Sequence, residues 1–414
     1  MFSTLFKNPI DVDRHQSAPY CAERQSYLRH LIKAGYARKT IIQTATCLLR
    51  ITRELKPSPP YRVSPIQVQR AALRWLKSRP VPPSSERQWT YKTFVQIATQ
   101  WLMFLGWLSV PEKKQTRFKK QLEDFLIWEK SERGISTRTL ETQERHIQTF
   151  LFWYQQKRDE LNVVKNADID DFLAYQGRTR WSRRTIATVV QSLRNFFRYG
   201  TRCGWCSSSL VDGIEGPCVY RQETLPSGPS WEQVQSIIAR VTTDHPNDIR
   251  DRAILMLLAI YGLRASEVSQ LYLKDVDWDH EQLTVRRTKN KKVHIYPLVP
   301  VVGDALIRYL KEVRPHCAYP EVFLKLKAPL GPVSRLSVHR LTNKQFSALE
   351  IKTLHRGPHA LRHACATHLV AEGFSFKEIG DHLGHSGTSA THIYAKVDLP
   401  HLRKVAEFDL GGLL

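Results

Sequence analysis

Tyr261-Gly262-Leu263-Arg264-Ala265-Ser266-Glu267 is the stretch that decides the fold of the second half of this chain. The residues before it, Asp248–Tyr261, are apolar enough to predict a buried helix that ends at Gly262. Ser266 and Glu267 can begin the next helix. Arg264 would then lie between two rigid helix ends, where its planar guanidinium can hold two phosphate oxygens or pair with Glu267. The stretch alone leaves both roles open.

Two short segments on either side of a basic turn come next in the sequence. Gln282–Arg286 and Val293–Leu298 alternate well enough to predict two strands, and the turn Thr288–Lys292 joins them as a hairpin. Lys289 lies in that turn, where a flexible ammonium can reach a DNA groove and protonate a leaving oxygen. The alternatives are a solvated basic turn, or the same role for a neighbouring lysine. After Val301 the sequence predicts mainly helices.

The segment His359-Ala360-Leu361-Arg362-His363 follows Pro358, a residue suited to the first turn of a helix. His359 and Arg362 are three residues apart, so both side chains should share one face near the helix start. The helix dipole favours a bound phosphate there. A capping histidine beside a surface arginine is the plain alternative.

The last two segments are Leu383-Gly384-His385-Ser386 and Ile393-Tyr394-Ala395. A tight turn at Gly384 could bring His385 to a phosphate, although a lone histidine is more often structural. Tyr394 is the predicted nucleophile. A phenol has a pKa of about 10, so it needs a base or a strongly positive site; His359 could take its proton, and the two arginines favour the phenolate. An isolated tyrosine here would be a half-buried aromatic.

Bulk composition limits the class of protein. The 414 residues predict two or three domains, and the net charge of +23 predicts a polyanionic partner such as nucleic acid. Residues 1–110 alone hold 17 Lys and Arg against 5 Asp and Glu. Without a secretory signal or an apolar run long enough to cross a bilayer, the expected location is cytoplasmic, with no membrane partner. Cys203, Cys206 and Cys218 form only half of a zinc site, so reduced structural cysteines are favoured.

The first 205 residues read as two copies of one helical unit. Ala34–Ile41 resembles Arg133–Leu140, 99 residues later: a helix ends at Gly, a basic turn follows, and a Thr can cap the next helix. A later helix of the first copy matches one of the second at an offset of 92 residues. Each carries an apolar stripe, which we expect to pack in the core rather than to stack on nucleic-acid bases. The stripe is Trp89, Thr93, Ile97, Trp101 and Phe104 in the first copy, and Trp181, Thr185, Val189, Leu193 and Phe196 in the second. The basic residues expected to meet phosphates from exposed positions are Arg38, Lys39, Arg87, Lys92, Arg138, Arg183 and Arg184.

The polar residues of the five segments together resemble the active site of the tyrosine recombinase (phage integrase) family. The set is Arg264, Lys289, His359, Arg362, His385 and Tyr394. The matching motifs are Gly-Leu-Arg-Ala-Ser-Glu, the hairpin lysine, His-Ala-Leu-Arg-His, Leu-Gly-His-Ser and a tyrosine nine residues after that last histidine. Their order and spacing agree across about 230–405, and 116–205 resembles the family's core-binding domain.

This resemblance implies a mostly α fold with a small β-sheet in the catalytic domain. Tandem helical (SAM-like) DNA-binding domains at 1–110 and 116–205 would be followed by a linker at 206–229 and an α+β catalytic domain at 230–414. The usual small members have a single helical domain before the catalytic one. Residues 1–110 resemble the second unit more than a small β-rich arm domain, which favours a longer clamp or a duplicated core-binding fold.

The resemblance also implies a reaction without cofactor or metal. Tyr394 would attack a DNA phosphate and form a 3′-phosphotyrosyl bond, freeing a 5′-hydroxyl. Arg264, Arg362 and His385 would stabilise the phosphorane, with His359 as general acid/base and Lys289 protonating the leaving oxygen. The expected enzyme is a site-specific DNA recombinase for integration, excision, resolution or transposition of a mobile element. It would act on double-stranded DNA as a homotetramer across two sites, with accessory DNA-bending or partner recombinase proteins as further partners.

Two other classes of protein remain open on the sequence. A type IB topoisomerase would use a similar site to relax supercoils without a partner duplex. A non-catalytic DNA-binding regulator would keep the basic domains with a decayed site, and the intact set of six residues argues against it.

Overall fold

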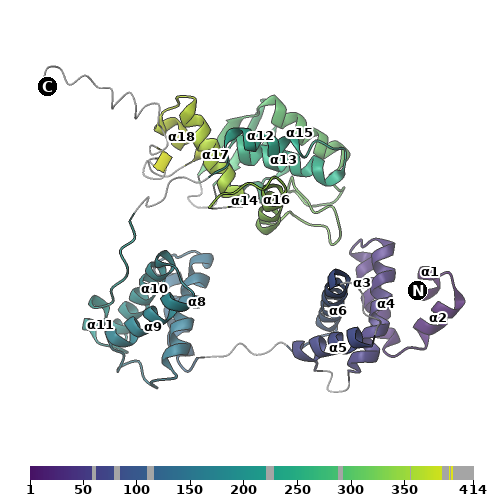
Figure 1. Ribbon diagram of the computed structural model, residues 1–414, viewed down its shortest axis with the longest axis horizontal. Coiled ribbons are helices and arrows are strands. Elements are labelled where there is room, and N and C mark those ends of the chain that lie inside the picture. The colour runs from purple at the N-terminus through teal and green to yellow at the C-terminus, as the bar shows by residue number, and fades with distance from the viewer. Residues whose placement is uncertain are drawn as a thin grey trace. The chain divides into compact units, whose positions relative to one another are not determined.

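The computed structural model describes residues 1–57, 62–78, 84–109, 116–220, 228–287, 292–354, 356–384, 391 and 393–394, with 84–89 described as backbone only. The chain divides into two compact units, Val110–Glu223 and Met1–Ser109 with Thr224–Leu414. The described residues are mostly helical, with one small sheet, as the sequence predicted. Figure 1 labels most of these helices along the chain. Three parts are described in turn: the first helical segment (1–109), the second helical segment (116–220) and the α+β segment (228–394).

The first helical segment folds around its own apolar core, in which Leu28, Leu48 and Trp101 are fully buried. Helix α5 begins at Pro65 after a capping box, in which Ser64 and Gln67 bond each other's backbone N–H groups. The elements are α1 Phe2–Leu5, α2 Pro9–Gln16, α3 Cys21–Lys33, α4 Arg38–Leu55, α5 Pro65–Lys77 and α6 Ser84–Phe104.

The second helical segment has a separate core built largely from aromatic rings. Phe150 lies 5.3 Å from Phe172 and 5.7 Å from Phe197, centroid to centroid, and all three side chains are buried. Leu210 and Ile214 also pack into this core, so the packed chain continues beyond residue 205. The elements are α7 Lys119–Ser131, α8 Thr137–Tyr154, α9 Asn166–Thr179, α10 Arg183–Arg202 and α11 Ser208–Asp212.

These two segments repeat the same sequence of helices. Helices α3 and α7 have 13 residues each, and α4 and α8 have 18 each. Gly35 and Gly134 take up positive φ angles of 77° and 59° after the first helix of each set, as the repeat predicted. The predicted threonine caps are wrong, because α8 is capped by Ser136 and α4 begins after Ala37; both threonines lie inside the first helical turn.

The predicted offset of 92 between the later helices is also wrong. Helices α6 and α10 end at Phe104 and Arg202, 98 residues apart, and each is followed by a glycine and a tryptophan. The Trp107 N–H bonds the Leu102 carbonyl, and the Trp205 N–H bonds the Gly200 carbonyl, both at 2.8 Å. The turn after each helix aligns α6 with α10 at one offset. The apolar residues do not, because they recur every three or four positions along a helix and permit several alignments.

The predicted apolar stripe is correct in the second copy for its last three residues, whereas Trp181 precedes α10 and Thr185 is half-buried, and the stripe is rotated in the first copy. Val189, Leu193 and Phe196 are buried in α10. In α6, Trp101 is buried but Phe104 is 39% exposed, and the buried face is completed by residues one position further along. Those residues are Phe94, Ala98 and Leu102. The side chain of Trp89 lies outside the described residues.

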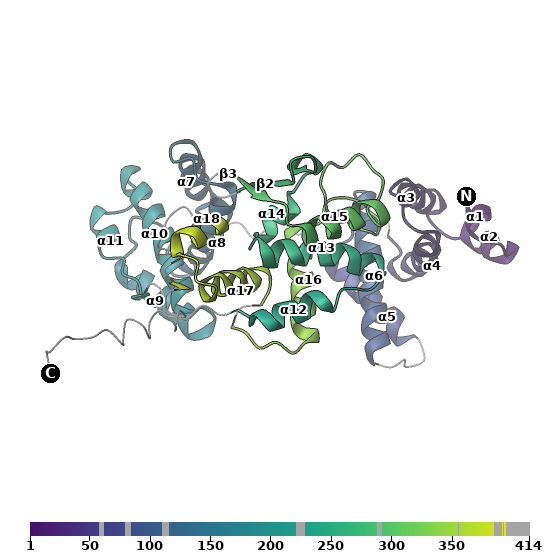
Figure 2. The same cartoon turned by 90° about the horizontal axis from the view of Figure 1, so that it is seen from above.

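The α+β segment is organised around α13 (Pro246–Ile260), whose second half, Ala253–Ala259, is apolar on every side and buried, as the prediction of a buried helix over Asp248–Tyr261 requires. Helix α13 packs against α12, α15 and α17, which surround it in Figure 2. The helices of this segment are α12 Trp231–Ala239, α13, α14 Ala265–Ser269, α15 Pro300–Glu312, α16 Arg335–Ala348, α17 Pro358–Ala371 and α18 Phe376–Leu383, with the 3-10 turn η1 at Leu273–Asp275. Ser230 caps α12, as predicted.

The sheet has three antiparallel strands in the order β1 (Val276–Asp277), β2 (Gln282–Arg286) and β3 (Val293–Pro297). The antiparallel pairing of the two predicted strands is confirmed, with Leu283 opposite Tyr296, while residues 288–291 of the predicted turn lie outside the described residues. The two-residue strand β1 was not predicted, because it is too short to show an alternating pattern.

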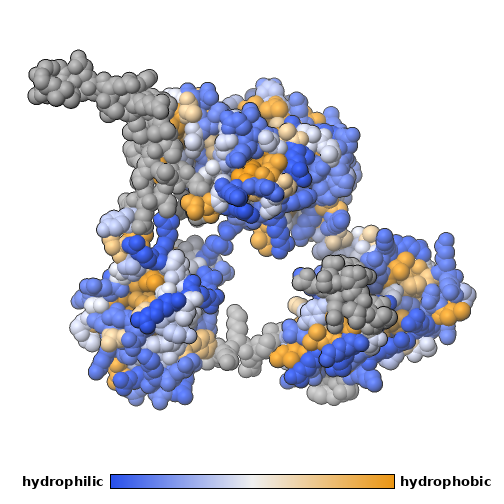
Figure 3. Space-filling view, viewed as in Figure 1, coloured by the Kyte–Doolittle hydropathy of each residue, from blue (hydrophilic) through white to orange (hydrophobic). Residues whose placement is uncertain are grey.

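Basic side chains lie mainly on exposed positions. Arg38, Lys39, Lys92, Arg138, Arg183 and Arg184 are all exposed, as expected; the side chain of Arg87 lies outside the described residues. The surface seen in Figure 3 is largely hydrophilic with small apolar patches. Among the described residues, no helix is long and apolar enough to cross a membrane.

Candidate active site

Arg264 lies where α13 ends and α14 begins. Gly262 has a φ of +57°, which lets the chain leave α13, and Arg264 is the residue before α14. The Arg264 Nη1 donates to Glu267 Oε1 at 2.7 Å, and the backbone N–H of Arg264 donates to Glu267 Oε2 at 2.8 Å. The arginine side chain stays 30% exposed while the carboxylate is fully buried. Arg264 therefore pairs with Glu267 and still presents part of its guanidinium outward.

Glu267 has a second cationic partner that the sequence reasoning missed. The buried Arg287 donates from Nη1 to Glu267 Oε2 at 2.8 Å and also bonds the Tyr296 hydroxyl and, at 3.3 Å, the His382 carbonyl. A Cβ atom on Gly384 would lie 2.4 Å from Arg287 Nε, so only glycine fits there. Arg287 thus joins the end of β2, α14 and the end of α18. The strand alternation was the available signal, since Leu283, Val285 and Arg287 share one face.

Arg362 and His359 lie on α17, which begins at Pro358 as predicted. Arg362 is 2% exposed and donates to the carbonyls of Gly262 and Leu383, both at 2.6 Å. Burial and the nearby Arg264 lower the pKa of Arg362 to about 10, so the guanidinium remains charged at neutral pH. Both of its partners are neutral carbonyls, so its positive charge is left available to an anion.

Arg264, His359 and Arg362 line one pocket of about 200 Å³. Helices α16 and α17 both begin at this pocket, through Arg335 and Pro358, so two helix N-termini add positive potential. Arg335 and His339 also line the pocket and were not predicted; their segment has no motif that marks it in the sequence. The site is suited to a phosphate group.

Tyr394 is buried beside this pocket rather than on the surface. Its side chain is 2% exposed and belongs to an apolar cluster with Cys365, Val370, Ile379 and Leu383. Burial raises the pKa of Tyr394 to about 12, and Arg362 acts against that rise. The phenol is therefore protonated at neutral pH and needs a base.

The structure places His363 next to the Tyr394 hydroxyl, with 2.9 Å between the oxygen and His363 Nδ1. The sequence predicted His359 for this contact. His359 lies one helical turn earlier, with its ring 4.6 Å from the His363 ring. Both histidines follow from the motif, but only packing shows which ring reaches the tyrosine. Lys289 and His385 lie outside the described residues.

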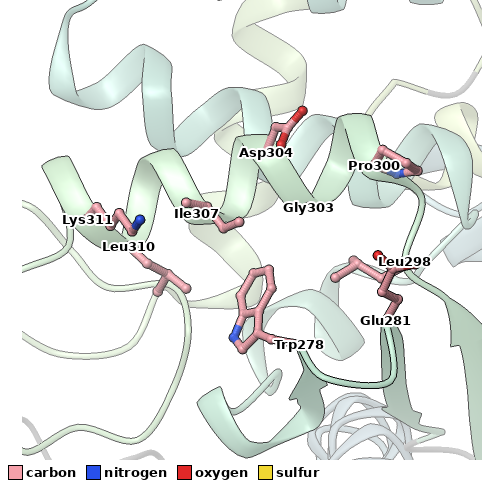
Figure 4. Close-up of a pocket in the computed structure, with 9 residues that line it drawn as sticks. All are labelled: Trp278, Glu281, Leu298, Pro300, Gly303, Asp304, Ile307, Leu310 and Lys311. Atoms are coloured by element: carbon pink, nitrogen blue, oxygen red, sulfur yellow. The ribbon is translucent and has the colours of Figure 1, made fainter.

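A larger cavity of about 560 Å³ lies elsewhere in the α+β segment, beside α15. Figure 4 shows Trp278, Ile307 and Leu310 among the residues that line it, and Glu281 and Asp304 also belong to the lining. Its apolar wall and acidic groups do not suit a phosphate, and none of the predicted site residues lines it. Among the described residues, no group of three His, Cys, Asp or Glu side chains is arranged to hold a metal ion.

Gly262→Ala is expected to lower the free energy of unfolding by about 2–3 kcal/mol. The alanine would have to adopt a left-handed φ of +57°, and its Cβ would lie 2.5 Å from Leu383 Cδ2. Thermal unfolding followed by circular dichroism measures the change. Gly373→Ala is the matched control, because its φ is +87° but nothing lies within 4 Å of the added Cβ. Equal losses in the two variants would show that the contact at Gly262 is unimportant.

Two family models match the chain. The model described as "Phage integrase family" matches residues 230–401, and the model described as "Phage integrase, N-terminal SAM-like domain" matches residues 122–204.

The chain is also similar to individual proteins. It is 31% identical over 292 residues to Tyrosine recombinase XerD of Xanthomonas axonopodis pv. citri, covering 69% of this chain and 95% of that protein. It is 29% identical over 293 residues to Tyrosine recombinase XerD of Listeria monocytogenes, covering 69% and 96%.

Solved structures share the fold. XerH site-specific recombinase bound to palindromic difH substrate matches with a TM-score of 0.57 and 15% identity, over 72% of this chain and 98% of that one. A lambda integrase(75–356) dimer bound to a COC′ core site matches with a TM-score of 0.53 and 16% identity, over 71% and 99%.

Proposed function

The chain belongs to the phage integrase family of tyrosine recombinases, and from that membership we propose how its residues cleave and rejoin double-stranded DNA. It is a site-specific recombinase of the integrase type. The observation that carries the proposed mechanism is the pocket lined by Arg264, His359 and Arg362, with the Tyr394 hydroxyl buried beside α17.

Tyr394 is the nucleophile of this mechanism. Its oxygen attacks a DNA phosphate and forms a 3′-phosphotyrosyl bond, while the bond from phosphorus to the 5′-oxygen breaks. Lys289 donates a proton to that oxygen, which leaves as a 5′-hydroxyl. A 5′-hydroxyl of a partner strand then attacks the phosphotyrosyl bond, so the bond energy is retained and neither ATP nor metal is required.

Charge complementarity supports the phosphate-binding role. Arg264, Arg287 and Arg362 surround the single carboxylate of Glu267, which leaves two positive charges. A phosphorane carries two negative charges, so the cluster is matched to the transition state rather than to the singly charged diester. His385 adds a further hydrogen bond to the phosphorane, and His359, which lines the pocket, acts on the phosphate as general acid/base.

The domains of the proposal are the helical DNA-binding domains 1–110 and 116–205, the linker 206–229, whose first part packs on the preceding core through Leu210 and Ile214, and the catalytic domain 230–414. The repeated helices support a duplicated DNA-binding fold, with 1–110 extending the clamp on the duplex. Two rounds of strand exchange would complete recombination in a homotetramer on two sites. This chemistry serves integration, excision, resolution or transposition of a mobile element. Accessory DNA-bending proteins or partner recombinases are further partners in the proposal.

Strand exchange tests the class of reaction. Incubating the protein with two duplexes that carry its native site is expected to yield recombinant duplexes, with a four-way junction as intermediate. A supercoiled plasmid without the site is the control and should remain supercoiled. Strong relaxation of that plasmid without any recombinant product would identify a type IB topoisomerase instead.

Deleting residues 1–110 is expected to weaken DNA binding in a salt-dependent manner. The deletion removes 17 Lys and Arg against 5 Asp and Glu, whereas the second helical segment and the α+β segment keep their own cores. If three phosphate contacts are lost, the slope of log affinity against log salt falls in magnitude by about 3. Fluorescence anisotropy across a salt series measures both slopes, and equal slopes would show that this segment has another role.

A further inference from the structure

We propose that His363 is the catalytic base that takes the proton from the Tyr394 hydroxyl during DNA cleavage and returns it during rejoining. The inference rests on the proposed function, because it assumes that Tyr394 is the nucleophile. It assigns a role to a residue outside the six that the sequence singled out.

His363 lies close enough to the Tyr394 hydroxyl to take its proton. A general base must lie within about 2.6–3.2 Å of the proton-bearing atom. His363 Nδ1 lies 2.9 Å from the Tyr394 oxygen. The tyrosine side chain is 2% exposed and packed among Cys365, Val370 and Leu383, so bulk water has little access to the phenol. A buried phenol must transfer its proton to a neighbouring side chain, and the imidazole is the basic group in contact.

The imidazole of His363 is held in place by its neighbours. His363 lies one turn after His359 on α17, and the two rings meet edge to face at 4.6 Å. Beside it, the backbone of Gly228 packs so closely against α17 that an added Cβ would lie 2.8 Å from the Ala360 carbonyl and 3.3 Å from His363 Cβ. A base fixed in this way needs little reorganisation when the proton moves.

The two histidines of α17 contact different parts of the site. His359 lines the phosphate pocket together with Arg264 and Arg362, whereas His363 contacts the nucleophile. The helix therefore presents one imidazole to the phosphate and the next to the tyrosine. The Tyr394 phenol and the His359 ring are among the groups that face His363; Arg362 precedes it in the chain and is directed to two backbone carbonyls.

The proton balance is as follows. His363 begins as the neutral tautomer with its proton on Nε2 and a lone pair on Nδ1. As the tyrosine oxygen bonds to phosphorus, its proton moves to Nδ1 and the ring becomes an imidazolium. The bond from phosphorus to the 5′-oxygen breaks, and that oxygen takes a proton from Lys289. In rejoining, the neutral Lys289 amine takes the proton of the attacking 5′-hydroxyl, and the imidazolium returns its proton to the departing tyrosine oxygen.

His363→Gln tests this role, because glutamine keeps a polar side chain but cannot act as a base near neutral pH. Single-turnover cleavage of a nicked suicide substrate is expected to slow by about 10²–10³-fold. The wild-type rate is expected to rise with pH as an imidazole loses its proton, ordinarily near pH 6.5. The variant should lack that rise. His368→Gln is the control, since His368 lies on the same helix but stacks on Trp231 at 4.1 Å.

A more acidic nucleophile separates a chemical role from a structural one. Replacing Tyr394 by a fluorinated tyrosine lowers the pKa of the phenol, so cleavage depends less on a base. In the His363→Gln background this replacement is expected to restore at least about tenfold of the lost rate. No restoration, or a pH profile in His363→Gln like that of the wild type, would overturn the assignment. Failure of the wild-type protein to form any adduct would instead overturn the proposed function.

Discussion

Tyr394→Phe is expected to form no covalent adduct with DNA while still binding it. The change removes the oxygen that attacks the DNA phosphate in the proposed mechanism, so adduct formation should be lost completely rather than slowed. The phenyl ring still fills the cluster with Cys365, Val370 and Ile379, and the loss of the hydrogen bond to His363 should cost only about 1 kcal/mol of folding free energy. Denaturing gel electrophoresis after incubation with a nicked suicide substrate separates the adduct from free protein.

Tyr309→Phe is the matched control for this experiment. Tyr309 is also buried in the α+β segment, and its hydroxyl accepts the Leu324 N–H at 3.0 Å. Its loss should affect stability without reducing adduct formation. An adduct that persists in Tyr394→Phe would remove Tyr394 from the mechanism.

Arg264→Ala is expected to slow cleavage by about 10²–10³-fold with little loss of fold. Its guanidinium lines the phosphate pocket, so the substitution removes one of the positive charges that face the phosphorane. Glu267 would keep Arg287 as its ion-pair partner at 2.8 Å, which prevents a buried unpaired carboxylate. The defect should therefore appear in the rate of the chemical step, measured by single-turnover cleavage at saturating protein.

Two further substitutions sharpen that comparison. Arg264→Lys keeps the charge but not the planar fork, so its rate should fall between those of the wild type and Arg264→Ala. Arg308→Ala removes one positive charge from the surface of α15, where Arg308 pairs with Asp244 and Glu312, and should leave the rate unchanged. A rate for Arg264→Ala equal to that of Arg308→Ala would exclude a direct role in phosphate stabilisation.

Local signals in the sequence were sufficient for much of the site. Gly262 and Pro358 each specify a short piece of backbone, and those two pieces carry Arg264, His359 and Arg362, which line one pocket. Such residues are predictable because their conformation depends on neighbours close in the chain.

Contacts between distant residues could not be predicted in the same way. Glu267 meets Arg287 across 20 positions, and Tyr394 meets His363 across 31. The motif contains two histidines one turn apart, and only the packing of Tyr394 against α17 distinguishes them. The predicted offset of 92 between α6 and α10 was wrong for a related reason. An apolar stripe can be aligned at several offsets, whereas the turn that ends each helix, with Trp107 or Trp205, can be aligned at one.

The direct test of the central claim is the chemical identity of the protein–DNA bond. Wild-type adduct trapped on a suicide substrate is digested with protease and nuclease, and the linked peptide is sequenced by mass spectrometry. The expected product is a nucleotide joined through its 3′-phosphate to Tyr394, with a free 5′-hydroxyl on the released strand. A bond to any other residue, or a linkage through a 5′-phosphate, would contradict it.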